Sequence, residues 1–307
     1  MNRRAWLLFV LVSFLWGIPY LLIKVAIDDL SPGLVVAGRV AIGAVIMLAI
    51  AARRGSLGAL RGRIPLVAIV AVVHVVIPFL LITYGEVHIT SSLTGLLIAI
   101  EPVAIALLMM RTEPLSAGRV AGLAVGFAGV AVLVGLDVSG DRLGLLGAAM
   151  VLLAALSYAV ATILVQRRAK GIPPEALAAG TTTISAIVLA PVGLLSLPSE
   201  PVAVRSWLAL AALGVFCTAV AMLAFYELIA LAGSNRAGLV TYANPVVAVL
   251  LGVLLLNEPL GVGTVAGFAL VVTGCWLSTR PQPVRADRRT PEDVVPQPAA
   301  AAACSGG

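Results

Sequence analysis

The sequence predicts an all-α polytopic membrane protein with ten transmembrane helices, arranged as two inverted five-helix repeats. Three observations support this class: an apolar composition, ten apolar runs of spanning length, and an internal repeat. Of the 307 residues, 61% are hydrophobic and only 11% are charged, and the mean hydropathy is +1.11. Soluble domains are roughly 45–50% apolar and about 25% charged. The composition therefore excludes an ordinary soluble globule, a disulfide scaffold and a disordered chain.

The apolar runs are separated by short connections that hold the proline, glycine and charged residues expected at helix ends. The ten runs lie near residues 5–27, 32–52, 64–84, 91–110, 118–136, 144–166, 176–197, 207–231, 237–256 and 261–279. The first run is too long for a typical signal peptide and has no small-residue cleavage site after it, so it is expected to stay as a membrane helix. Residues 1–4 form a short N-terminus, and residues 280–307, rich in Pro, Ala, Arg and Asp, are predicted to be a disordered cytoplasmic tail.

The basic residues predict the orientation, because cytoplasmic loops carry an excess of Lys and Arg. With a cytoplasmic N-terminus, sixteen basic residues fall on that side and only Arg142 and Arg205 on the other, while Lys24 and Arg39 lie inside spans. The net charge of +6 is therefore a topology signal, and no nucleic-acid partner is expected. Arginine outnumbers lysine by 18 to 2, which favours a GC-rich bacterial genome. We expect a bacterial cytoplasmic membrane protein with both termini in the cytoplasm.

The two halves of the chain resemble each other with a slowly increasing offset. A shift of 142 residues aligns Trp16 with Tyr158, and a shift of 145 aligns the Glu-Pro pairs that begin at Glu113 and Glu258. Each copy holds five helices, so short connections would bring the second copy into the membrane upside down. Inverted repeats of this kind build many secondary transporters, with the substrate site near the midplane.

The repeated motifs also resemble the EamA-type pattern of the drug/metabolite transporter superfamily. The residues that carry the resemblance are Trp16-Gly17, Lys24, the Glu-Pro-Leu triplets at 113–115 and 258–260, and the glycine-rich helices Gly118–Leu136 and Gly261–Leu277. The resemblance covers 5–136 as a first repeat and 144–279 as a second. It implies two inverted five-helix bundles and transport of small metabolites, commonly amino acids or drug-like compounds.

Glu101 is the first candidate for a functional residue, because a charge at the bilayer centre is costly. It is the eleventh residue of its run, about 15 Å along a helix that rises ~1.5 Å per residue, and so lies near the midplane. Pro102 removes the hydrogen bond to the carbonyl of Ile98, so a bend is expected there. The carboxylate could bind a substrate amine or carry a proton. The alternative is a structural ion pair with Arg39 or hydrogen bonds to neighbouring helices.

Arg39 lies slightly nearer the outer side than Glu101, and its guanidinium suits a substrate carboxylate. An ion pair with Glu101 is the equal alternative, and the two roles could alternate. His74 lies at the depth of Glu101 and could relay protons, or it could be a hydrogen-bonded packing residue. Lys24 lies near the outer end of the first run, where it could line a cavity or extend to the interface.

Two aromatic and polar segments complete the predicted substrate-binding or proton-coupling set. Trp16 and Tyr20 are one turn apart, so one helix face could line a cavity wall, although plain packing explains them equally well. Tyr242 and Asn244 precede Pro245 in the repeat counterpart of the Glu101 segment.

The glycines spaced by four residues at 118–126 and 263–267 predict packing seams within or between subunits, which leaves open whether the chain forms a homodimer. Glu113 and Glu258 lie in loops beside proline, where they are expected to cap or tether helices. No metal motif, nucleophile elbow or phosphate-binding loop occurs, so neither an enzyme nor a cofactor or metal site is predicted.

The predicted function is a secondary transporter that exports a small amphoteric solute such as an amino acid by alternating access, coupled to protons. The partners expected are a small-molecule substrate, the lipid bilayer and protons. A multidrug or lipid-linked sugar exporter of the same fold is the alternative, with Trp16, Tyr20 and Glu101 as a cation-binding wall. A membrane scaffold without solute flux, or an intramembrane enzyme, would be a different class.

Overall fold

The computed structural model describes residues 1–110, 117–137 and 141–279, and these residues are helical with no strand among them. The first half contains α1 (Arg3–Gly17), α2 (Pro19–Ile27), α3 (Pro32–Arg53), η1 (Ser56–Leu60), α4 (Ile64–Ala71), η2 (Val72–Val76), α5 (Ile77–Gly85), α6 (Ser91–Ile98), α7 (Glu101–Met109) and α8 (Ala117–Asp137). The second half contains α9 (Arg142–Arg168), α10 (Pro174–Leu195), α11 (Val204–Gly214), η3 (Val215–Val220), α12 (Ala221–Ala232), α13 (Ser234–Ala237), α14 (Val240–Leu256) and α15 (Val262–Thr279).

In the described chain, seven helical segments are long and apolar enough to cross a membrane. Some of these segments consist of two or three of the elements above. Three shorter apolar helices accompany them, at Val120–Gly135, Val240–Leu256 and Val262–Leu277. The chain is thus a multi-pass, all-helical membrane protein. The predicted count of ten spans and their inversion remain predictions. The predicted tail at 280–307 lies outside the described residues.

Proline explains two of the breaks within the long helices. The first segment breaks at Ile18, directly before Pro19, and the fourth breaks at Ala99 and Ile100, before Pro102. A proline lacks the N–H that would continue the helix and clashes with the preceding turn. The bend expected at Glu101 is therefore confirmed, and it places Glu101 in the first turn of α7. Pro245, in contrast, lies inside the continuous helix α14.

The third helix of each half contains a π-helical turn in its middle. The turn η2 begins at Val72 and η3 begins at Val215, 143 residues later, with His74 and Cys217 as the third residue of each. A π-helical turn leaves main-chain carbonyls without their usual partners, and such turns occur often at functional sites. Two serines from the second half donate hydrogen bonds to main-chain carbonyls at η2. Ser157 Oγ donates to Val73 O at 2.6 Å, and Ser185 Oγ donates to Ala71 O at 3.2 Å.

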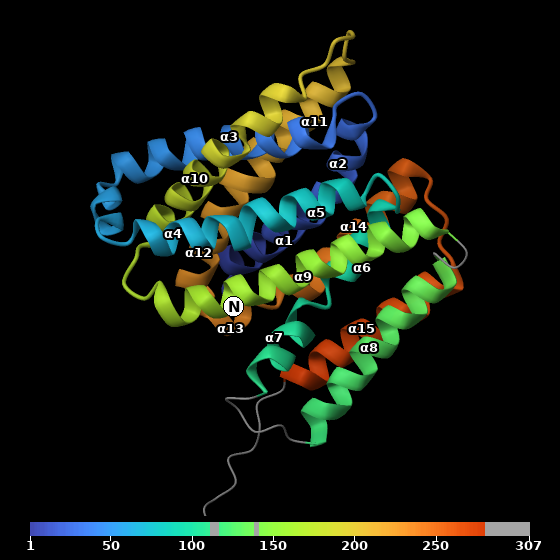
Figure 1. The fold of residues 1–307 in the computed structure, drawn as a ribbon. Coiled ribbons are helices and arrows are strands. Elements are labelled where there is room, and N and C mark those ends of the chain that lie inside the picture. Colours follow the sequence, from blue (N-terminus) through green and yellow to red (C-terminus); the bar gives the residue numbers. More distant parts are fainter. Residues whose placement is uncertain (111–116, 138–140, 280–307) are drawn as a thin grey trace, which may run out of the picture.

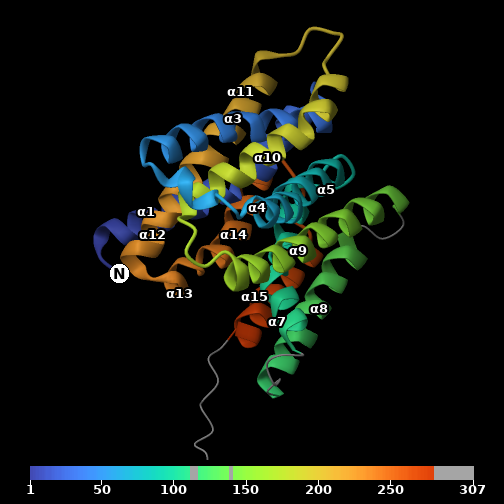
Figure 2. The ribbon, with the colours of Figure 1, turned by 60° about the vertical axis from the view of Figure 1, so that its left-hand side comes forward.

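The two halves pack against each other in pairs of corresponding helices. Helix α3 lies along α10, and α8 lies along α15, at opposite ends of the molecule (Figures 1 and 2). Further contacts between the halves occur in matching pairs, because the first helix of each half packs on the third and fourth helices of the other half. Helix α1 packs on α12 and α14, and its counterpart α9 packs on α5, α6 and α7. The elements near His74 and Glu101 are therefore held by helices of both halves.

The glycine-rich helices α8 and α15 form a close seam within one chain. A Cβ built on Gly274 would lie 2.3 Å from the backbone nitrogen of Gly126, and one on Gly129 would lie 2.7 Å from that of Val271. Small residues permit this approach of two backbones. Of the two alternatives that the sequence leaves open for these glycines, the structure shows the packing within a subunit.

Glu258 caps the first turn of α6 and ties it to the end of α14. Its carboxylate accepts hydrogen bonds from Ser91 N at 2.7 Å, Ser92 N at 2.9 Å and Ser92 Oγ at 2.5 Å. The first N–H groups of a helix have no partner inside the helix, so an acceptor there is stabilising. The capping role predicted for Glu258 is confirmed. Glu113 lies outside the described residues.

Candidate functional site

Arg39 is the centre of a buried polar cluster that draws on both halves of the chain. Only 6% of Arg39 is exposed, and its guanidinium carbon lies 4.2 Å from the ring centre of Phe79 on α5. Its Nε is buried without a hydrogen-bond partner. The guanidinium is close enough for electrostatic interaction with Tyr20 on α2 and Tyr158 on α9. A buried cation that stacks on an aromatic ring and keeps a free donor is suited to bind an anionic group.

Glu101 lies in the same region, at the start of α7. Its carboxylate accepts a hydrogen bond from Thr162 Oγ1 on α9 at 3.1 Å. The N-terminus of a helix favours a negative charge, which adds to this bond. Among the described residues, no ion pair joins Glu101 to Arg39, so the hydrogen bond to a neighbouring helix is the alternative that the structure shows. Tyr158 is within electrostatic reach of both side chains.

His74 packs at the edge of this cluster. Its ring meets the ring of Tyr158 edge to face, with centres 5.6 Å apart and planes at 83°. The imidazole is carried by the π-helical turn η2, of which His74 is the third residue. The structure thus joins Arg39, Glu101 and His74 through Tyr158, a residue that the sequence analysis did not select.

Trp16 and Tyr20 pack in different hydrophobic clusters. Trp16 packs against Phe225 with ring centres 4.6 Å apart, in a cluster near the N-terminus. Tyr20 is buried in a different cluster, against Gly95 of α6. The helix breaks at Ile18, between the two aromatic residues, and a cavity wall that both would line stays a prediction.

Tyr242 and Asn244 lie in the first turns of α14. Tyr242 packs against the hydrophobic cluster that includes Ile100, and Oδ1 of Asn244 is buried without a hydrogen-bond partner. The backbone carbonyl of Asn244 faces Gly17, where a Cβ would lie 2.8 Å from it. Asn244 is thus an available acceptor beside the break of the first helix.

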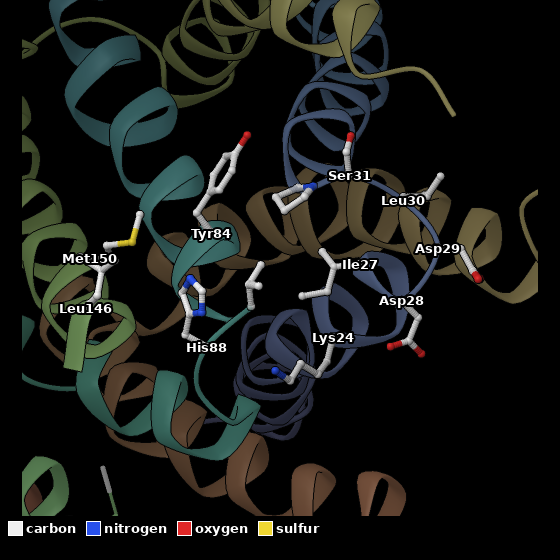
Figure 3. A pocket seen from close by; sticks show the side chains of 12 residues that line it. Lys24, Ile27, Asp28, Asp29, Leu30, Ser31, Tyr84, His88, Leu146 and Met150 are labelled. Carbon is white, nitrogen blue, oxygen red and sulfur yellow. The ribbon is translucent and has the colours of Figure 1, made fainter. Parts of the chain in front are cut away.

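Lys24 lines a pocket at the opposite end of α2 from Trp16. The pocket has a volume of about 790 Å³ and is called the Lys24 pocket below; Figure 3 shows it between α2 and the end of α5. Its polar lining residues are Lys24, Asp28, Asp29, Ser31, Tyr84 and His88. Nζ of Lys24 donates to the backbone carbonyls of Glu86 and, at 2.8 Å, Ile89. Lys24 therefore lines a cavity and holds the connection between α5 and α6.

Several residues of the cluster were missed by the sequence analysis. Tyr158 had a signal, since it aligns with Trp16 in the repeat. Glu86, outside the cluster, is also fully buried, but it follows the predicted run 64–84 and was not selected. Phe79 and Thr162 are common residue types inside apolar helices and gave no signal. In the part of the chain that the structure describes, no group of three His, Cys, Asp or Glu side chains could hold a metal ion.

The fold and the cluster define a class: a multi-pass membrane protein in which two halves of similar sequence enclose buried charged side chains. The sequence profile of the EamA-like transporter family matches residues 3–135 and 145–280. The chain belongs to this family and is a transporter of the EamA type.

Two relatives agree with this assignment, and a solved structure shares the fold. The chain is 25% identical to the uncharacterized transporter YvbV of Bacillus subtilis, over 91% of this chain and 93% of the relative. It is 26% identical to an uncharacterized transporter of Archaeoglobus fulgidus, over 90% and 99% respectively. A solved crystal structure with 24% identity covers 91% of this chain and 97% of its own, with a TM-score of 0.64, and so shares the fold.

Proposed function

We propose that the chain is a secondary transporter of ten spans in two inverted halves, which moves a small amphoteric metabolite such as an amino acid. Alternating access would carry the solute out across the bacterial cytoplasmic membrane, driven by protons. The contacts that recur with the halves exchanged support the inverted arrangement. Rocking of such halves around a midplane site is a common transport mechanism.

The observation that carries the substrate class is the unpaired Nε of Arg39 in a cluster that also holds Glu101. Two opposite charges in one buried cluster, not paired with each other, match a molecule that bears both charges. Each charge of such a molecule needs a partner when it leaves water. Arg39 would bind the carboxylate of the solute, and Glu101 would bind its ammonium group or the coupling proton.

The proposal is tested by counterflow in proteoliposomes with labelled neutral amino acids and a labelled quaternary ammonium cation. We expect amino-acid counterflow in the wild type, its loss in Arg39→Gln, and its retention in Arg54→Gln, an exposed arginine that pairs only loosely with Glu175. Exchange of the quaternary ammonium ion alone would favour the multidrug alternative. No flux of any solute by folded protein would favour a membrane scaffold.

Proton coupling is tested separately at Glu101. Glu101→Gln should abolish accumulation driven by a proton gradient and leave exchange of solute, because the amide keeps a hydrogen bond to Thr162 but binds no proton. Glu227→Gln is the matched control, since Glu227 pairs with Arg4 at the surface. Wild-type proton coupling in Glu101→Gln would remove Glu101 from the mechanism.

A further inference from the structure

Glu86 is a buried carboxylate outside the cluster described above. It follows the last residue of α5, none of its surface is exposed, and neither of its carboxylate oxygens has a hydrogen-bond partner. Burial of an ionised carboxylate without donors is costly, whereas a protonated carboxyl carries no charge into the interior. The surroundings of Glu86 therefore favour the form that holds a proton.

Two hydroxyl groups near Glu86 in the chain are also without partners. Oγ1 of Thr83, one turn earlier on α5, and Oγ of Ser91, the first residue of α6, are both buried and make no hydrogen bond. A protonated carboxyl is itself a donor, which such hydroxyl oxygens can accept. The segment from Thr83 to Ser91 thus contains a carboxylate with no donor and two hydroxyl groups with unused acceptors.

The charged and titratable groups that face Glu86 come from three elements. Lys24 and Tyr20 on α2 and Arg39 on α3 interact with it electrostatically, as does Glu258 at the end of α14. Helix α9 packs on the end of α5 with the uncharged residues Gly147 and Val151. Burial raises the pKa of the Glu86 carboxyl well above its usual range, although Lys24 and Arg39 oppose this shift.

The contacts of Lys24 are also compatible with a protonated Glu86. Nζ of Lys24 donates to two main-chain carbonyls, of Glu86 and Ile89, and not to the carboxylate of Glu86. An ionised carboxylate within reach would be the stronger acceptor for an ammonium group. These contacts leave the carboxylate of Glu86 without an ammonium donor.

Glu86 interacts electrostatically with residues of two polar regions. Lys24 lines the Lys24 pocket, whereas Tyr20 and Arg39 belong to the buried cluster. We propose that Glu86 is a second proton-binding site of this protein, filled from the Lys24 pocket, and that its occupancy sets the charge balance at Arg39. A proton from water adds to one carboxylate oxygen and leaves by the same oxygen, so no other reactant is needed. Only the link to Arg39 rests on the proposed function.

The test is infrared difference spectroscopy of the full chain in lipid nanodiscs, titrated from acid to alkaline pH, with the proton as the only ligand. We expect the carbonyl stretch of a protonated carboxyl at neutral pH, lost in Glu86→Gln and retained in Glu200→Gln, an exposed loop residue. Glu101→Gln should leave the carbonyl band that is assigned to Glu86 in place. Lys24→Gln should keep the band to higher pH, because a cation that opposes protonation is removed.

A folded Glu86→Gln protein with an unchanged carboxyl band would overturn the proposal, and so would the absence of the band from the wild type at neutral pH. Folding is checked by size exclusion and circular dichroism. If Glu86→Gln does not fold, Glu86→Asp should shift the band rather than remove it, and an unshifted band would again refute the site. The infrared measurement needs no transported solute. Its result therefore tests Glu86 even if the counterflow experiment shows no transport.

Discussion

Replacement of Gly274 by alanine probes the seam between α8 and α15 with a single methyl group. A Cβ at this position would lie 2.3 Å from N and 2.5 Å from Cα of Gly126, and 2.7 Å from the carbonyl oxygen of Gly122. All three atoms belong to backbone, which cannot turn aside as a side chain can. Because carbon atoms pack at about 3.5–4.0 Å, the two helices would have to separate by ~1 Å.

The loss of stability that Gly274→Ala causes can be estimated from the close contacts along the seam. Overpacking by one or a few methylene groups usually destabilises by ~1–3 kcal/mol. The upper part of this range is expected for Gly274→Ala, since α8 and α15 also approach closely at Gly129 and Gly267 and both contacts would loosen together. At Gly267 the nearest atom is Cγ of Leu133, which belongs to a side chain, so Gly267→Ala should cost less.

The assay is the thermal unfolding midpoint of purified protein in detergent, measured at several protein concentrations. Gly135→Ala is the matched control on α8, because a Cβ there meets no atom within 4 Å. We expect the order of destabilisation to be Gly274→Ala, then Gly267→Ala, with Gly135→Ala unchanged. Equal midpoints for Gly274→Ala and the control would refute the close seam. A loss that depends on protein concentration would instead place the seam between subunits.

Three further predictions concern the cap, the π-helical turn and the topology. Glu258→Ala leaves two N–H groups of α6 without an acceptor and should cost ~1–3 kcal/mol in the same assay, against no change for Glu200→Ala. Ser157→Ala leaves the carbonyl of Val73 unpartnered and should cost about 1 kcal/mol, whereas an unchanged midpoint would show that water replaces the hydroxyl. With Cys304 replaced by Ser, an impermeant maleimide should label Glu200→Cys in intact cells and Gly58→Cys only after permeabilisation; the reverse pattern would contradict a cytoplasmic N-terminus.

Much of the helical framework could be predicted from the sequence because proline and glycine mark helix ends. The predicted runs 32–52 and 64–84 correspond to helical segments at Pro32–Arg53 and Ile64–Gly85. Each begins at or next to a proline, which is favourable in the first turn. The break at Ile18 was not predicted, although Pro19 follows it and carries the same signal as Pro102. The π-helical turns η2 and η3 leave no mark in an apolar run, because they depend on packing.

The candidate site was harder to predict, because burial of a charge depends on partners far away in the chain. Glu101 was found from its depth in a run, which is a local property. Glu86 was not, since its burial depends on Lys24, 62 residues earlier, and on the connection that Lys24 holds. Tyr158 could have been found by treating each polar or aromatic residue of one repeat as a reason to inspect its counterpart.

The comparison of counterparts also shows that the charges are unequally divided between the halves. Lys24, Arg39 and Glu101 align with Gln166, Thr181 and Asn244, all uncharged. In the proposed alternating-access cycle, the two halves would exchange their conformations. The ionisable groups belong to the first half and would not be exchanged. The inward-open and outward-open states would then differ in electrostatic energy even with identical packing. A proton on Glu86 or Glu101 changes that difference directly, so protonation is a sufficient means to bias one state over the other.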